Sequence, residues 1–492
     1  MPEPIDIRKR ARTKIVATLG PRSSDPETIA ALIRAGADVF RLNMAHGEPE
    51  QQQVHVDNIR RVSDELDRPT AVLVDLAGPK IRLGEVHNDC VFCETGGEFW
   101  FVEEGKQAAE NEFTSSYTPL LRELSVGDTV MLADGTVSMV VEEKLPGRVR
   151  TRVVQRGDIR SRQGINLPGV RLSAPAISVD DHQHALWAAR AGADFVSLSF
   201  VRAPDEVKAL RDILRSSGSE AAVVAKIEKS EALDGLDDVV EASDAVMVAR
   251  GDLGVEIDVA RMPIEQKRII QTCHRLQKPA IIATQMLDSM HTSLRPKRSE
   301  VTDIANAVLD GGDACMLSGE TAIGQYPVES VAMMNRICLA TEEDAAKNPL
   351  RAEAENTSST LHEITRSVVH GAGEMAHALR AKLVIVASHS GRTALGLSQQ
   401  RSFVPTIGVS TSDETLRRMC LYWGVTPLRE APAENLQALI QHADAWACRL
   451  GLATRGDRIV IVGGSHLAAG PGSGSLARGV HDIVIVHEVE GC

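Results

Sequence analysis

Three charged residues in one stretch of the chain have the types and spacing that phosphate chemistry needs. Lys226 and Glu228 follow the apolar run 222–225, and Asp252 follows a second apolar run, 245–249. Short apolar runs bounded by turn chemistry are typical of buried parallel strands, and residues two apart on a strand project from one face. A cation beside two carboxylates could hold a divalent metal and a phosphorylated anion together. An isolated Lys-x-Glu is more often a surface ion pair, so the interpretation depends on the rest of the chain.

Composition limits the class of protein. The chain has 492 residues, 43% of them hydrophobic, and a net charge of −13. This length predicts two or three domains, and the negative charge argues against general nucleic-acid binding. No apolar run approaches the roughly 18 residues of a membrane span, and no apolar segment follows the basic residues near the N-terminus, so neither a membrane protein nor a secretory signal is expected. We therefore expect a cytoplasmic protein.

A strand–helix unit recurs along much of the chain and positions the charged residues. Eight such units are the number in a closed (β/α)₈ TIM barrel, whose active site lies at the C-terminal ends of its strands. A doubly wound open sheet is the alternative. The expected strands lie at or within 14–18, 39–42, 71–74, 191–202, 222–225, 245–249, 278–287 and 311–321.

Two regions depart from this rhythm and give the expected domain organisation. Residues 78–175 show short strands and turns, which predicts a small all-β insertion placed as a lid at the barrel mouth. After a polar segment, five further strands alternate with helices and predict an open parallel sheet with one edge strand possibly antiparallel. The expected domains are a barrel in two parts (1–77, with a short N-terminal tail, and 176–345), the β-rich lid 78–175, and a C-terminal α/β regulatory domain, 346–492.

Seven sequence blocks resemble the pyruvate kinase family, in the same order along the chain. Together they are far more specific than any one of them, and the resemblance covers nearly the whole chain. The blocks are RTKIVATLGP (12–21), FRLNMAHG (40–47), GPKIRLG (78–84), GINLPG (164–169), VMVARGDLGVEI (246–257), ATQMLDSM (283–290) and ANAVLDGGDACMLSGETA (305–322).

The resemblance implies phosphoryl transfer from phosphoenolpyruvate to ADP, giving pyruvate and ATP, with Mg²⁺ or Mn²⁺ as cofactor. Lys226 matches the transition-state stabiliser, and Arg41 matches the arginine that binds phosphate, a task suited to its forked donors. Glu228 and Asp252 match the metal ligands. The matching substrate-binding residues are Arg41, Lys226, Gly251, Asp252 and Thr284.

Further matches concern the proton and the nucleotide. Thr284 is counted as catalytic because it could lie on the route that protonates the enolate, although the donor stays open. Asn43, His46 and Arg82 match the nucleotide side of the site. Asp134, in a turn of the insertion, could approach the nucleotide when the lid closes, or could simply be a hairpin residue.

The chain departs from the family where many members bind K⁺. Ala45 stands in place of a Ser in an Asn-x-Ser-His motif. Leu76 and Lys80 stand in place of the Thr and Glu of Asp-Thr-Lys-Gly-Pro-Glu, after Asp75. A ligand oxygen is lost and an ammonium group is added, so Lys80 could act as an internal substitute for the monovalent cation, as in a similar branch of the family. We therefore expect no requirement for K⁺. Gln163, where a Lys is common, leaves nucleotide preference open.

The C-terminal region could hold an effector. Ser388, Ser390, Arg392 and Thr393 stand between an expected strand and helix and resemble the family's effector site for sugar phosphates or AMP. A capped helix beside a flexible loop would explain the same residues. The resemblance also implies a homotetramer. Two other functions were weighed: a catalytically silent nucleotide- or sugar-phosphate-binding relative, and another Mg²⁺-dependent barrel enzyme that handles an enolate.

Overall fold

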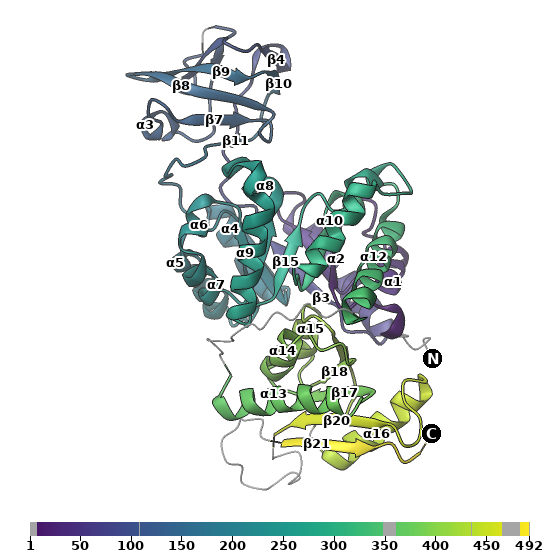
Figure 1. Cartoon of the computed structure of the whole chain (residues 1–492). Coiled ribbons are helices and arrows are strands. Elements are labelled where there is room, and N and C mark those ends of the chain that lie inside the picture. The colour runs from purple at the N-terminus through teal and green to yellow at the C-terminus, as the bar shows by residue number, and fades with distance from the viewer. Residues whose placement is uncertain (1–6, 108, 348–360, 434, 465–482, 492) are drawn as a thin grey trace.

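The computed structural model describes residues 7–107, 109–347, 361–433, 435–464 and 483–491, and the structural statements below concern those residues. Three bodies are stacked along the molecule: a β-rich insertion, a central barrel and a C-terminal α/β domain (Figure 1). No helix among the described residues is both long and apolar enough to cross a membrane.

The central body is a closed barrel of eight parallel strands, as expected, and not an open doubly wound sheet. Neighbouring strands pair in chain order, and the first strand closes the ring by pairing with the last. The strands are β1 (Lys14–Thr18), β2 (Val39–Asn43), β3 (Ala71–Asp75), β12 (Phe195–Leu198), β13 (Ala222–Ile227), β14 (Ala245–Ala249), β15 (Ala280–Ala283) and β16 (Ala314–Leu317).

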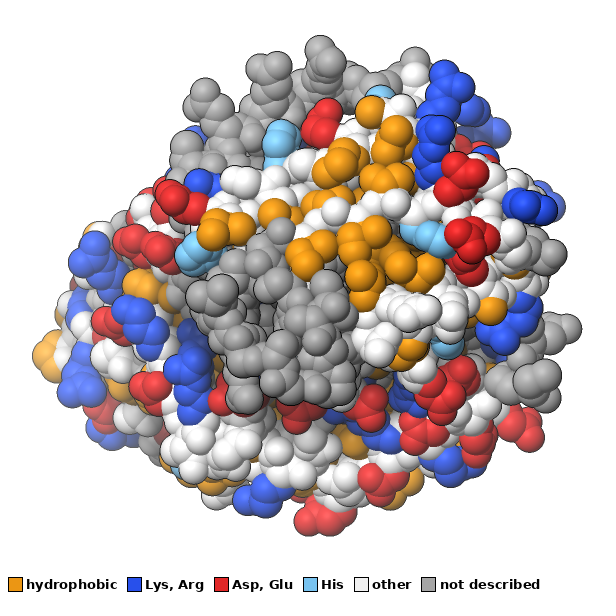
Figure 2. Space-filling model, turned by 90° about the horizontal axis from the view of Figure 1, so that it is seen from below, with side chains coloured by type: hydrophobic (Ala, Val, Ile, Leu, Met, Phe, Trp, Pro, Cys, Tyr) orange, Lys and Arg blue, Asp and Glu red, His pale blue; other side chains and the backbone are white. Residues whose placement is uncertain are grey.

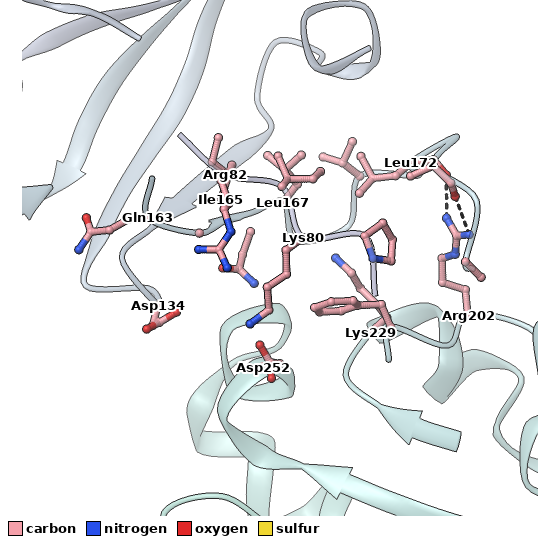
Figure 3. A pocket seen from close by; sticks show the side chains of 18 of the residues that line it. Lys80, Arg82, Asp134, Gln163, Ile165, Leu167, Leu172, Arg202, Lys229 and Asp252 are labelled. Atoms are coloured by element: carbon pink, nitrogen blue, oxygen red, sulfur yellow. Dashed lines mark hydrogen bonds between the residues drawn. The ribbon is translucent and has the colours of Figure 1, made fainter. Parts of the chain in front are cut away.

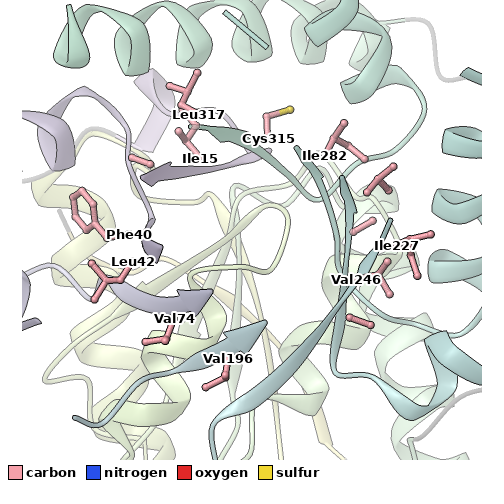
Figure 4. Close-up of a cluster of buried hydrophobic side chains, with 14 of the residues drawn as sticks. Ile15, Phe40, Leu42, Val74, Val196, Ile227, Val246, Ile282, Cys315 and Leu317 are labelled. Atoms are coloured by element: carbon pink, nitrogen blue, oxygen red, sulfur yellow. The ribbon is translucent and has the colours of Figure 1, made fainter. Parts of the chain in front are cut away.

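Helices surround the barrel because alternate strand residues are apolar on the outer face. Phe40, Leu42 and Leu317 point from their strands into this outer core (Figure 4), which also contains helix residues such as Ile29 and Leu32. The helices are α1 (Pro26–Ala35), α2 (Pro49–Glu65), α4 (Val179–Arg190), α5 (Pro204–Ser216), α6 (Ser230–Asp234), α7 (Leu236–Ala242), α8 (Arg250–Glu256), α9 (Met262–Arg275), α10 (Arg298–Leu309), α11 (Gly319–Ala322) and α12 (Pro327–Lys347).

Local sequence signals explain where some of these helices begin. The Asp25 side chain accepts a hydrogen bond from the Thr28 N–H and caps α1, whose first residue is a proline. Ser178 and Asp181 form a capping box at the start of α4. Both arrangements satisfy backbone N–H groups that a helix N-terminus leaves without partners.

An aspartate stands immediately before four alternate strands, at the base of the barrel, where the strands begin. These residues are Asp38, Asp194, Asp244 and Asp313. Each carboxylate accepts the backbone N–H of the preceding strand, at 2.7–3.0 Å, from Ile15, Val72, Val223 and Ala280 respectively. Each also pairs with an arginine, at 2.7–3.1 Å: Arg10, Arg60, Arg211 and Arg401. The repeated contact joins the strands of the barrel in pairs.

The insertion between β3 and α4 is all-β apart from short helical turns, and it has its own hydrophobic core. A six-stranded sheet has the order β11-β7-β8-β9-β5-β6, and β10 pairs with β4. The elements are η2 (His87–Asp89), β4 (Cys90–Cys93), β5 (Glu98–Val102), β6 (Glu112–Phe113), α3 (Leu120–Glu123), β7 (Thr129–Leu132), β8 (Val137–Leu145), β9 (Arg148–Gln155), β10 (Gly157–Arg160) and β11 (Ile165–Asn166). The expected all-β character is confirmed.

The C-terminal domain is an open five-stranded sheet of order β19-β18-β17-β20-β21. Its strands are parallel except β21, which runs antiparallel to β20 at the edge, as expected. The elements are α13 (Glu363–Ala378), β17 (Leu383–Ala387), α14 (Arg392–Gln399), β18 (Thr406–Val409), α15 (Asp413–Met419), β19 (Val425–Leu428), α16 (Leu436–Arg449), β20 (Arg458–Gly463) and β21 (Ile483–Glu488).

This domain docks against the base of the barrel, at the end opposite the insertion (Figure 1). The inward-facing residues of the barrel strands and the buried residues of α15 and the following turn form one hydrophobic cluster. Polar contacts accompany it: Arg417 pairs with Asp194 at 2.6 Å, and the buried Lys14 amine donates to the Val425 carbonyl at 2.7 Å. Hydrophobic side chains also gather on the outer face of the molecule at this end (Figure 2).

Candidate active site

The expected site residues stand at the C-terminal ends of the barrel strands, the mouth of the barrel. Arg41 lies on β2, Asp75 ends β3, Lys226 lies on β13, and Glu228 follows that strand. In a parallel barrel these ends converge, which is why residues distant in the chain meet there.

Asp75 is the centre of this arrangement. One of its oxygens, Oδ2, accepts hydrogen bonds from Arg41 Nε at 2.8 Å and Nη2 at 2.5 Å. The other, Oδ1, accepts the Ser197 hydroxyl at 2.5 Å and lies 3.4 Å from Lys226 Nζ. Burial alone would raise the pKa of Asp75, but Lys226 and Arg41 lower it to about 2. The carboxylate therefore stays charged and holds both cations.

Lys226 is enclosed by oxygen atoms. Its Nζ lies 2.9 Å from Glu228 Oε1 and donates to the Ser199 hydroxyl at 2.7 Å, in addition to its contact with Asp75. Burial alone would lower the pKa of Lys226, but Asp75 and Glu228 raise it above its ordinary value. A permanent ammonium group at the mouth can stabilise an anion but cannot act as a general base near neutral pH.

Glu228 is almost completely buried, and Asp252 lies near it in the first turn of α8. Glu228 Oε2 accepts the Phe200 N–H at 2.7 Å. Burial raises the pKa of Glu228, Lys226 opposes that rise, and the negative charge of Asp252 adds to it. A divalent cation beside the two carboxylates would offset both the desolvation and the repulsion.

The donor set suits a metal that brings other ligands with it. Among the described residues, no group of three or more His, Cys, Asp or Glu side chains is placed to hold a metal ion. Mg²⁺ is commonly held by one or two carboxylates together with substrate oxygens and water. Glu228 and Asp252 therefore fit Mg²⁺ better than a metal such as zinc that needs several protein ligands.

Gly251 and Thr284 meet across the ends of β14 and β15. The Gly251 N–H donates to the Thr284 hydroxyl oxygen at 2.9 Å, and that hydroxyl donates to the Ala283 carbonyl at 2.7 Å. Thr284 has a φ of 68°, in the left-handed region that a β-branched residue rarely adopts. A backbone N–H and a hydroxyl at one point can together bind a carboxylate.

A cavity of about 350 Å³ lies between the insertion and the mouth (Figure 3). Asp134 and Gln163 line it from the insertion, Lys80 and Arg82 from the connecting segment, and Asp252 from α8. The Lys80 side chain points toward Asp252 in this view. Cationic groups facing a carboxylate across a cavity of this size suit a phosphorylated small molecule.

The tip of the β7–β8 hairpin reaches the barrel at this cavity. Ala133 and Asp134 have positive φ values of 51° and 53°, as a tight hairpin turn requires. A Cβ added at Gly135 would lie 3.4 Å from Val255 Cγ2 on α8. The hairpin tip therefore lies close to the helix that carries Asp252.

Not every expected nucleotide residue lines this cavity. Asn43 ends β2 and its side chain accepts the Ala45 N–H at 3.1 Å; His46, on the loop that follows, is exposed. Gln163 does line the cavity, but its Oε1 accepts the Arg160 N–H at 2.7 Å.

The expected K⁺ neighbourhood contains buried and exposed parts. Leu76 is fully buried, and its carbonyl accepts the Ser199 hydroxyl at 2.7 Å. Lys80 is exposed and forms no ion pair with a described residue.

The expected effector residues surround the start of α14, far from the mouth. The Ser388 hydroxyl accepts the Gly391 N–H at 3.0 Å, and Arg392 Nε donates to the Ser390 hydroxyl at 3.4 Å. Ser388 and Thr393 are buried, whereas Ser390 and Arg392 are exposed. The sequence also predicts that a Gly/Ser-rich loop, residues 463–475, faces them; from residue 465 onward this loop lies outside the described residues.

The sequence interpretation missed two residues. One is Ser197 on β12, whose hydroxyl orients Asp75. It stands two residues before Ser199, and this pair of polar residues with strand spacing was the available signal. Arg250, beside Gly251, reaches the loop after β15. A lone arginine next to a motif gave no indication of that contact.

Comparisons with known proteins show similarity over most of the chain. The model of the pyruvate kinase barrel domain matches residues 10–331, and that of the pyruvate kinase alpha/beta domain matches residues 366–478. A pyruvate kinase from Staphylococcus aureus strain MRSA252 is 37% identical over 455 residues, covering 92% of this chain and 77% of that protein. The counterpart from strain USA300 is 36% identical over the same length. The crystal structure of a pyruvate kinase from Cryptosporidium parvum superimposes with a TM-score of 0.90 at 30% identity, covering 98% of this chain and 97% of that one.

Proposed function

The chain belongs to the pyruvate kinase family and transfers a phosphoryl group from phosphoenolpyruvate to ADP, giving pyruvate and ATP, and we propose how its residues perform this last step of glycolysis. The family match does not favour the two alternatives, a catalytically silent relative or a different enolate-handling barrel enzyme.

The observation that carries the proposal is the pair of cations held by Asp75 at the mouth. Arg41 presents a forked set of donors from β2, and Lys226 presents a permanent ammonium group from β13, with β3 and β12 between these strands. In phosphoryl transfer the negative charge spreads over the oxygens of the group in flight, so positioned cations lower the barrier. We assign phosphate binding to Arg41 and stabilisation of the transferring group to Lys226.

Glu228 and Asp252 would hold Mg²⁺ or Mn²⁺. The bound ion supplies charge neutralisation between the carboxylates and the phosphoryl oxygens. Glu228 is fixed for this task by the Phe200 N–H, and Asp252 faces the cavity from α8.

The carboxylate of phosphoenolpyruvate is assigned to Gly251 and Thr284. The Gly251 N–H and the Thr284 hydroxyl now bond to each other at 2.9 Å, and both can turn to a bound carboxylate. We also propose that Thr284 takes part in protonating the enolate; the proton donor itself is not assigned.

The nucleotide is assigned to the cavity between the insertion and the mouth. Arg82 lines that cavity, and Asn43 and His46 are proposed to approach ADP from the β2 loop when the insertion, residues 78–175, closes as a lid. Asp134 of the insertion and Asp252 of α8 line the same cavity, which supports a lid role for the insertion.

Lys80 is proposed to replace the monovalent cation that other members of the family bind near Asp75, Leu76 and Ala45. It is an unpaired ammonium group within the described residues and lines the cavity opposite Asp252. A fixed positive charge there makes K⁺ unnecessary.

The remaining assignments concern the whole protein. We propose a regulatory role for the C-terminal domain, residues 346–492, with a sugar phosphate or AMP bound near Ser388, Ser390, Arg392 and Thr393. The proposed bounds of the barrel domain are residues 1–77 and 176–345. A homotetramer in the cytoplasm is proposed from the family and its place in glycolysis.

Pyruvate formation from phosphoenolpyruvate, ADP and Mg²⁺ tests the function directly. Lys226→Ala should lower kcat at least about 100-fold, the scale of removing one transition-state donor. Lys208→Ala, which removes an exposed lysine on α5, is the control and should leave kcat unchanged. No pyruvate from the unaltered protein would contradict the function, and a loss below about threefold would remove Lys226 from its role.

A further inference from the structure

Arg250 joins two strand ends at the barrel mouth. It is the first residue of α8, directly after β14, and its side chain crosses to the loop after β15. Nε donates to the Ala283 carbonyl at 3.2 Å and Nη2 donates to the Thr284 carbonyl at 2.5 Å. Nη1 pairs with Asp303 of α10 at 2.7 Å. The guanidinium thus uses all three of its nitrogens.

The loop that Arg250 contacts has an unfavourable backbone. Thr284 and Gln285 are consecutive, and their φ values are 68° and 56°. Residues other than glycine seldom adopt this left-handed backbone region, and β-branched residues do so least of all. Such a conformation persists only where surrounding contacts fix it, and it is concentrated at functional sites.

The same loop sets the direction of the Thr284 hydroxyl. With the Ala283 and Thr284 carbonyls both held, Thr284 Oγ1 lies 2.9 Å from the Gly251 nitrogen. Gly251 follows Arg250 in the chain, so one residue fixes both partners of this pair. Planar, forked donors are suited to holding two carbonyls in a fixed relation, which a lysine cannot do.

We propose that Arg250 is a positioning residue for the reaction: its guanidinium holds the Thr284–Gln285 backbone so that the Thr284 hydroxyl and the Gly251 N–H face the substrate carboxylate together. The inference rests on the proposed roles of Thr284 and Gly251. It predicts that loss of Arg250 affects binding of phosphoenolpyruvate and protonation of the enolate, and leaves metal binding nearly intact.

The chain offers a matched control in Arg211 of α5. At the opposite end of β14, Arg211 donates to the Ala242 carbonyl at 2.6 Å and pairs with Asp244 at 2.8 Å. Arg211 therefore makes the same kinds of contact, at the base of the barrel. An arginine that only stabilises the fold should behave like Arg211.

The test uses Arg250→Met, Arg250→Lys, Asp303→Asn and Arg211→Met in the full-length protein. Three quantities are measured: the KM for phosphoenolpyruvate, the rate at which the pyruvate methyl group takes up deuterium from D₂O with ATP and Mg²⁺ (by NMR), and the affinity for Mn²⁺ without substrate (by EPR). Deuterium uptake follows the proton step in the reverse direction, so it reports on the Thr284 region separately from phosphoryl transfer.

Arg250→Met should raise KM and slow deuterium uptake, each by about tenfold or more, with Mn²⁺ affinity within about threefold. Arg250→Lys should recover only part of either loss. Asp303→Asn removes one ion pair of Arg250. Because the Asp303 side chain is 39% exposed, this variant should show a smaller change of the same kind. Arg211→Met should lower thermal stability and change none of the three quantities.

Equal changes in Arg250→Met and Arg211→Met, or a parallel loss of Mn²⁺ affinity, would overturn the inference. If Arg250→Met does not fold, unchanged KM and deuterium uptake in both Arg250→Lys and Asp303→Asn would do so. Failure of the unaltered protein to convert phosphoenolpyruvate would instead overturn the proposed function.

Discussion

Asp75 is the residue on which both cations of the site depend. Arg41 and Lys226 would repel each other without the carboxylate between them, and each is buried enough for that repulsion to matter. The sequence singled out Lys226, Glu228 and Asp252 by type and spacing, and the family resemblance added Arg41. It named Asp75 only as a neighbour of Lys80, because its bridging position depends on three strands meeting and on side-chain rotamers.

Asp75→Asn should therefore be strongly destabilising. Removing one partner from a buried charge network costs about 3–5 kcal/mol, whereas an exposed pair contributes under about 1 kcal/mol. Thermal or urea unfolding at pH 7 measures the difference. Glu65→Gln is the control, since Glu65 pairs with Arg61 at 3.0 Å on the surface of α2. Equal losses in the two variants would contradict the central role of Asp75.

The Asp75 carboxylate also makes the stability of the fold depend on pH in acid. Its folded pKa of about 2 lies below the ordinary value near 3.9 for an unfolded Asp. A depressed pKa contributes stability that is complete above the unfolded value and is lost as pH falls through the folded one. Between about pH 4 and pH 2, the free energy of unfolding should decrease more steeply with falling pH for the unaltered protein than for Asp75→Asn. Urea unfolding at a series of pH values measures it.

Lys80 makes the cation requirement testable at a single residue. Activity in K⁺-free buffer should stay within about twofold of that in K⁺, because the ammonium group supplies the charge. Lys80→Met should lower kcat, and Lys106→Met, which removes an exposed lysine of the insertion, should not. A fall of about tenfold or more on K⁺ removal from the unaltered protein, restored by K⁺, would contradict the prediction.

At the scale of elements, the strand ends were the most predictable part of the molecule. Each barrel strand is a short, mostly apolar run with a polar or charged residue at its C-terminal end or directly after it, and this pattern can be read from the sequence without knowledge of the tertiary contacts. Side chains that act across elements were not predictable. Arg250 is the example: its contacts lie on the next strand's loop, and the loop's left-handed backbone has no glycine to signal it.

The connection between the insertion and the barrel bears on nucleotide affinity. Gln163 lines the cavity, yet its side-chain oxygen is engaged by the Arg160 N–H. Gln163→Lys would free that contact and add a cation facing the phosphates, so the Kd for ADP should fall by about three- to tenfold. Isothermal calorimetry measures it. Gln107→Lys, elsewhere in the insertion, adds the same charge outside the cavity; an equal gain there would show a general charge effect.

At the scale of the whole molecule, the three-body architecture was predictable but the docking of the bodies was not. Domain types follow from the rhythm of strands and helices over long stretches. The placement of the C-terminal domain depends on a few scattered residues, among them Lys14, Arg401 and Arg417, which have no pattern in the sequence.

Arg417→Met should loosen this docking. Asp194 would keep Arg60 but lose its contact with the C-terminal domain at 2.6 Å, a charge-assisted hydrogen bond worth about 1.5–3 kcal/mol. Differential scanning calorimetry should show a lower transition temperature, or separation into two transitions. Arg449→Met, at an exposed position of α16, is the control. No change in Arg417→Met would mean that the hydrophobic cluster and the remaining polar contacts are sufficient to hold the domains together.

The aspartates at the base of the barrel also have a mechanical consequence. The C-terminal domain places Arg417 on Asp194 and Arg401 on Asp313, and these carboxylates precede β12 and β16. The two strands are four apart in a ring of eight, so the attachments lie on opposite sides of the barrel. Two opposite fixed points resist torque about the barrel axis, since each acts with the full radius as its lever arm. The C-terminal domain is thereby held in one rotational setting relative to the strands whose far ends carry the reaction.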